Sequence, residues 1–169
     1  MAYTNFLYAK TVTQTTGSDE ISWTLDRAPN SLNTNSRITE PLTSFNEKQT
    51  GLLKFSNFDL PGSIPAVQSD GSTATTIDGI EVKIEANKDN RIIDSIIRLT
   101  LDGTLSGSNK ADASAGVIHT YGGSTDVWGT TIGQSDLATL GVAIKYKSDT
   151  IPHTDTCKVW NVQIRIHYT

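Results

Sequence analysis

The chain has 169 residues, a length that fits one domain, and its single cysteine excludes the disulfide framework of a small secreted protein. Its formal net charge is −4, and its 14 Lys and Arg residues are scattered along the sequence. This charge pattern argues against nucleic acid and anionic membranes as partners, because both are bound through basic patches.

The N-terminal ten residues lack the basic and apolar regions of a signal peptide, and no apolar run approaches the length of a membrane span. We therefore expect a soluble protein that is synthesised in the cytoplasm and is not exported by the general secretory route.

The N-terminal third of the chain predicts only weak strands, around residues 6–12, 21–25 and 52–55. Its polar, turn-rich sequence predicts a less regular segment over residues 1–50. We expect this segment to belong to one β-sandwich domain that covers residues 1–169.

Stronger strands follow in the middle of the chain. Ile80, Val82 and Ile84 alternate with charged residues, as in a strand that buries one face. Residues 92–101 contain more β-branched apolar side chains, which favour a more central strand over a helix. A weak strand is expected over residues 117–121.

The C-terminal part contains the nearest approach to a helix and the clearest strand. Residues 134–140 predict a single capped helical turn, and Val142 and Ile144 then resume the alternation of a strand. The longest alternation closes the chain: Trp160, Val162, Ile164, Ile166 and Tyr168 lie on one face and polar residues on the other.

Glycine-containing turn signals separate these elements, including Asp78-Gly79, Asp102-Gly103 and Gly122-Gly123. Many short strands with such turns predict an all-β fold: an antiparallel β-sandwich, jelly-roll-like, with about eight strands. The predicted structural core consists of Val82, Ile84, Leu99, Trp128, Val142, Ile144, Trp160, Val162, Ile164, Ile166 and Tyr168.

Several segments, taken in order, resemble a series found in a family of β-sandwich structural proteins of tailed-phage and prophage virions. The segments are 55–61 (FSNFDLP), 76–84 (TIDGIEVKI), 98–103 (RLTLDG), 107–111 (GSNKA), 121–129 (YGGSTDVWG), 133–136 (GQSD), 140–142 (LGV) and 164–168 (IRIHY). The resemblance covers the chain from about Leu52 onward. Leu140 replaces an aromatic residue of the family pattern, and His167 replaces its penultimate tyrosine.

This resemblance implies a virion component such as a capsid decoration (cement) protein, a tail appendage subunit or a fibre module. It implies no reaction and no cofactor, and the family's habit suggests a homotrimer. Sandwich edges and a lightly charged, Thr-rich surface also favour self-association.

Candidate chemical sites are few. His119, His153 and His167 lack metal-ligand spacing, and Cys157 has no motif partner. Glu81 and Glu85 share a strand face, but four residues on a strand span roughly 13 Å, too far for a hydrolytic carboxylate pair. We therefore predict no catalytic, cofactor or metal site.

Two further possibilities are weighed against ordinary structural roles. The loop of residues 103–110 has the wrong spacing for a phosphate loop and is expected to be a turn. Asp70, Asp78 and Asp102 each precede a glycine, so calcium is conceivable, but ordinary Asp-Gly turns explain the same pattern.

The competing function is binding of a receptor or glycan, for which Trp23, Trp128 and Trp160 are the candidate stacking residues. Packing in the core is the preferred role for Trp128 and Trp160, and we expect His167 to be a solvated strand residue. A small hydrolase is a third class, disfavoured by the lack of an acid, base or nucleophile set.

The sequence therefore favours a non-enzymatic virion protein, made in the bacterial host cytoplasm, that binds other virion proteins. A decoration subunit on the capsid is preferred, because an appendage adhesin usually joins its binding domain to a shaft. A tail or fibre module that binds a host receptor or glycan is the alternative.

Overall fold

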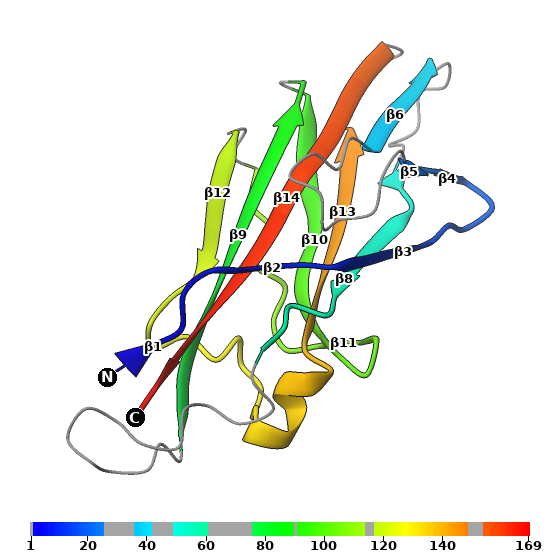
Figure 1. Cartoon of the computed structure of the whole chain (residues 1–169). Coiled ribbons are helices and arrows are strands. Elements are labelled where there is room, and N and C mark those ends of the chain that lie inside the picture. The colour runs from blue at the N-terminus through cyan, green and yellow to red at the C-terminus, as the bar shows by residue number, and fades with distance from the viewer. Residues whose placement is uncertain are drawn as a thin grey trace.

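A computed structural model describes residues 2–25, 36–41, 49–60, 76–89, 91–113, 117–148 and 154–169. In these residues two β-sheets pack face to face as an antiparallel β-sandwich (Figure 1). The described residues form no α-helix, and their one helical element is the 3-10 helix Gln134–Ala138. The antiparallel β-sandwich and the single capped turn are therefore both confirmed, but the described residues form fourteen strands rather than about eight.

The first sheet is built around the two longest strands. Its order is β12 (Ile118–Gly122), β9 (Ile77–Lys88), β14 (Thr154–Tyr168), β6 (Ser36–Pro41) and β5 (Thr24–Leu25). The short strands β1 (Ala2–Tyr3) and β2 (Leu7–Tyr8) also pair with β14.

The second sheet is built around β10 and β13. Its order is β11 (Thr104–Ser106), β10 (Ile92–Leu101), β13 (Gly141–Ser148), β7 (Gln49–Thr50) and β4 (Glu20–Ile21). In addition, β8 (Leu52–Ser56) pairs with β13, and β3 (Thr11–Thr15) pairs with β8.

The consecutive strands β9, β10, β12, β13 and β14 alternate between the sheets, apart from the short β11 hairpin, which stays in the second sheet. This alternation is the feature that the fold shares with jelly rolls. It places the apolar rows of β9 and β14 opposite those of β10 and β13, so the core lies between the sheets.

Ten of the eleven predicted core residues are buried in this interior. They are Val82, Ile84, Leu99, Trp128, Val142, Ile144, Val162, Ile164, Ile166 and Tyr168. The sequence therefore predicts the burial of these ten residues correctly.

Trp160 is the exception, because it is only partly buried. A β-bulge lies between Val159 and Asn161, whose partners Ala86 and Glu85 are consecutive on β9. The bulge adds one residue to β14 and shifts its side-chain alternation, so Val159 rather than Trp160 continues the inward row. The prediction that Trp160 belongs to the core is wrong for this reason.

The prediction that His167 is solvated is also wrong, because His167 is buried. Tyr3 pairs with it from β1, and the two ring centroids are 5.8 Å apart. On the same outer face, Nε2 of His167 lies 3.1 Å from Oε2 of Glu81. The N-terminal segment therefore covers part of a face that the alternation alone marks as exposed.

Strand β6 was not predicted, since it lies within the segment expected to be less regular. The C-terminal strand also begins earlier than the alternation from Trp160 predicts. β14 begins at Thr154, and its first residues pair with β6. The sequence of β6 is mostly polar and shows no clear alternation. The start of β14 contains the buried Cys157 and Val159, but the bulge puts them out of phase with Val162 and the residues that follow.

Truncation of Ile164 tests the central ladder. Ile164 is fully buried and pairs with Val82. We expect Ile164→Ala to lower the free energy of unfolding by about 2–5 kcal/mol, since it removes buried methyl groups and leaves a cavity. The exposed Val117→Ala is the control, and we expect it to change stability by less than about 0.5 kcal/mol. Chemical denaturation measures both; equal effects would contradict the register.

Candidate functional site: the Trp128 cluster and the adjoining recess

Trp128 is the buried centre of the loop that follows β12. Its indole Nε1 donates a hydrogen bond to the carbonyl oxygen of Ile80 on β9, at 2.9 Å. Its backbone N–H donates to the carboxylate of Asp126 at 2.8 Å. Trp128 has a φ of 60°, a left-handed conformation that a bulky residue rarely adopts. Tertiary contacts therefore hold this residue in place.

Two glycines make room for Trp128. A Cβ atom on Gly122 would lie 2.1 Å from the Ile80 carbonyl oxygen and 2.5 Å from the indole Nε1. A Cβ atom on Gly107 would lie 2.5 Å from the Trp128 carbonyl oxygen. Both positions also have positive φ, so glycine is required by conformation and by space.

Lys110 closes the cluster from the solvent side. Its Nζ lies 2.7 Å from the Asp126 carboxylate and 6.0 Å from the centroid of the Trp128 ring. Burial alone would raise the pKa of Asp126, but the bonds from Lys110 and from the Trp128 N–H outweigh it and lower that pKa. Asp126 thus favours its charged form, which orients both donors.

We call Ile80, Gly107, Lys110, Gly122, Asp126 and Trp128 the Trp128 cluster. Its members come from three of the segments on which the virion-protein resemblance rests, residues 76–84, 107–111 and 121–129. Segments that are separate in sequence therefore form one packed unit. The preference for packing over ligand contact at Trp128 agrees with its complete burial.

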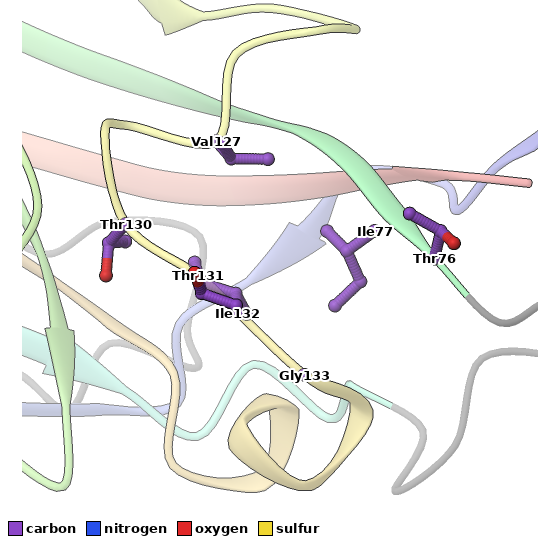
Figure 2. Close-up of a pocket in the computed structure, with 7 residues that line it drawn as sticks. All are labelled: Thr76, Ile77, Val127, Thr130, Thr131, Ile132 and Gly133. Atoms are coloured by element: carbon purple, nitrogen blue, oxygen red, sulfur yellow. The ribbon is translucent and has the colours of Figure 1, made fainter.

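A recess of about 380 Å³ adjoins this cluster. It lies between the start of β9 and the loop that leads to the 3-10 helix (Figure 2). The described residues that line it are uncharged: Thr76, Ile77, Val127, Thr130, Thr131, Ile132 and Gly133. Methyl groups and hydroxyls suit contact with a small apolar side chain of a partner better than proton transfer.

Trp23 and Trp128 do not offer a face to a sugar. Trp23 is buried, its indole N–H donates to the Gly51 carbonyl at 2.8 Å, and its ring lies 6.0 Å from that of Tyr146. In the described part of the chain, Tyr3 and Tyr8 are exposed aromatic residues, at 60% and 44% exposure. Sequence reasoning missed them because they lie in a segment without periodicity.

A second polar cluster is buried at the opposite end of β9. Lys88 Nζ lies 2.5 Å from Oδ1 of Asp94, and the Tyr121 hydroxyl donates to Oδ2 of Asp94 at 2.5 Å. Burial, and then the Asp94 carboxylate, raise the pKa of Tyr121, so its hydroxyl stays a donor. Burial also raises the pKa of the nearby Cys157 thiol, as expected of an inert cysteine.

The two glutamates considered above have structural partners. Glu81 contacts Arg165 and His167, and Glu85 accepts a hydrogen bond from the Asn161 side chain at 2.7 Å. These contacts support the interpretation of a charged strand face rather than a catalytic pair.

Two of the three Asp-Gly positions considered for calcium, Asp78 and Asp102, lie in the described residues. Asp102 and Gly103, with φ values of 50° and 73°, form the two-residue turn between β10 and β11, as expected of an ordinary turn. Asp78 accepts a hydrogen bond from the Thr169 hydroxyl. Asp70 and the candidate histidine His153 lie outside the described residues.

The described ranges contain neither a metal-binding group nor a membrane-spanning helix. No group of three His, Cys, Asp or Glu residues comes together there as a metal site. In the same part of the chain, no helix has the length and apolarity needed to cross a membrane.

No protein-family model matches the chain, and no curated protein matches it.

Gly122 and Gly103 form a matched pair that tests the packing of the Trp128 cluster. Both have positive φ, but a Cβ on Gly103 would meet nothing within 4 Å. We expect Gly103→Ala to cost about 1–2 kcal/mol from backbone conformation alone. Gly122→Ala should cost roughly 1–3 kcal/mol more, because the new methyl group displaces the indole. Denaturant unfolding measures the difference, and equal costs would contradict the described packing.

The buried pair Lys88 and Asp94 can be compared with the exposed pair Lys10 and Asp59. Lys88→Met should destabilise the fold by about 3–5 kcal/mol, since it leaves a buried carboxylate without its cation. Adding Asp94→Asn should recover part of this loss.

Lys10→Met is the control, and we expect it to cost no more than about 1 kcal/mol. Thermal and denaturant unfolding of the variants check these values. A Lys88→Met variant as stable as the Lys10→Met variant would show that the carboxylate is solvated.

Proposed function

We propose that this chain is a structural, non-catalytic subunit of a tailed-phage or prophage virion, and that it binds the outer surface of the capsid as a decoration or cement protein. The observation that carries the proposal is the Trp128 cluster. Three of the segments that resemble the virion family pack there against one another. The matching segments therefore form one packed unit of this chain and are not scattered over its fold.

In this proposal, the recess beside the cluster supplies the contact surface for a neighbouring virion protein. Its threonine and isoleucine side chains can bury a partner's apolar group while the hydroxyls satisfy nearby backbone groups. One such contact is weak. A subunit held at one site meets the next at high effective concentration, so repeated copies attach firmly to a lattice.

From the resemblance we also propose that the chain forms a homo-oligomer, in particular a trimer. We propose further that it is synthesised in the cytoplasm of the host bacterium. The major capsid protein is the expected partner in the capsid position, and tail proteins are the partners in an appendage.

The alternative is a tail or fibre module that binds a host receptor or glycan. The exposed rings of Tyr3 and Tyr8 are the observation that favours it, because exposed aromatic faces can stack on sugars. Tyr3 lies near the recess, because β1 pairs with His167 and Tyr168 of β14, which pair with the start of β9. Tyr8 pairs further along β14, with Gln163, so variants of Tyr8 separate the two functions best.

Purified particles of the phage that encodes the chain test the proposal. Quantitative mass spectrometry should find copy numbers comparable with those of the major capsid protein, and particles that lack the chain should rupture at a lower temperature. A few copies confined to the tail would overturn the capsid assignment.

A point variant links the proposal to the recess. Thr131 is exposed and lines the recess, whereas Thr104 is exposed on the β10–β11 hairpin and does not. We expect Thr131→Arg to reduce binding to particles that lack the chain by about tenfold or more, and Thr104→Arg to leave binding unchanged. Equal binding by both variants would place the contact elsewhere.

A further inference from the structure

Strand β12 forms one edge of the first sheet. It pairs with β9 on one side, and within the described ranges no strand pairs with its other side (Figure 1). An edge strand offers a row of backbone N–H and C=O groups that can pair with another chain.

The pairing with β9 determines which backbone groups point outward. The carbonyl oxygen of Val117 accepts a hydrogen bond from the N–H of Ala86 at 2.9 Å. Because hydrogen-bonded and non-hydrogen-bonded pairs alternate in an antiparallel ladder, the backbone groups of Ile118, Thr120 and Gly122 point away from β9. These three residues form the free edge.

The side chains of this edge do not protect it. Val117 and Ile118 are 54% and 55% exposed, and Thr120 is exposed as well. Natural edges are usually protected by Lys, Pro or a bulge. Residues 117–122 contain no charged residue and no proline, and the pairs from Ile118 to Gly122 show no register shift against β9. Only Gly122, with a φ of 78°, departs from the extended backbone conformation.

We propose that β12 pairs antiparallel with β12 of a second copy of this chain, so that the two first sheets join into one. With Thr120 opposite Thr120 across the two-fold axis, Ile118 of each copy lies opposite Gly122 of the other. Gly122 has no side chain and cannot gain one in this fold, so it leaves room for the exposed Ile118. The edge is therefore complementary to itself in shape and in hydrogen bonding.

This pairing is isologous and closes at two copies. It therefore predicts a dimer, in contrast to the trimer that the family resemblance implies. A dimer would exclude the proposed trimer, but binding to the capsid depends on neither, so the dimer and the proposed capsid function can fail separately.

Light scattering on the purified chain tests the association. We expect twice the mass of one chain at micromolar concentrations. Ile118→Lys places a charge on the edge, and Thr120→Pro removes an outward N–H without removing a bond to β9. Each should weaken the dimer by about tenfold or more.

The control is Leu25→Lys, which changes an apolar residue of 39% exposure on β5, at the far end of the same sheet. It should leave the dimer intact, and circular dichroism should show β-structure in every variant. A monomeric or trimeric wild-type chain would overturn the proposal, as would a dimer unaffected by both edge variants.

A cysteine tests the register directly. Hydrogen-bonded antiparallel neighbours have Cα atoms about 5.5 Å apart, within the range of a disulfide. Thr120→Cys should therefore give a cross-linked dimer on mild oxidation, whereas Thr104→Cys should not. The native Cys157 is buried and should not interfere. A dimer that Thr120→Cys does not cross-link would exclude this register.

Discussion

The hydrogen bond from the Trp128 indole to the carbonyl of Ile80 is the contact on which the described surface depends. It fixes the loop after β12 against β9, and so it sets the wall of the neighbouring recess. The left-handed backbone at Trp128 costs free energy, which the burial of a large aromatic ring offsets. A loop held in this way can present a surface of constant shape to a partner.

The buried charges at the other end of β9 impose a different constraint. Lys88, Asp94 and Tyr121 come from three strands in two sheets, and each satisfies a polar group that the interior would otherwise leave unpaired. Such a network adds little net stability, but it penalises any packing of the sheets that separates the partners. The network therefore mainly favours this arrangement of the two sheets over alternative packings.

The two proposed contact surfaces lie on different parts of this scaffold. The recess is formed by the loop 127–133 and the start of β9, whereas the free edge belongs to β12. A dimer joined through β12 would carry two recesses. Attachment of such a dimer to a repetitive particle surface would then be bivalent, and this strengthens binding without enlarging either contact.

The sequence by itself determined the fold class and the inward rows of β9, β13 and most of β14, because burial of one strand face requires alternation. Only the tertiary structure decided the position of Trp160, since the pairing with β9 determines that Val159, and not its apolar neighbour Trp160, continues the inward row. The burial of His167 depends on Tyr3, which is more than 160 residues away in sequence. The Trp128 cluster was visible as separate glycine-rich motifs, but the steric reason for those glycines lies in contacts between strands that local sequence does not encode.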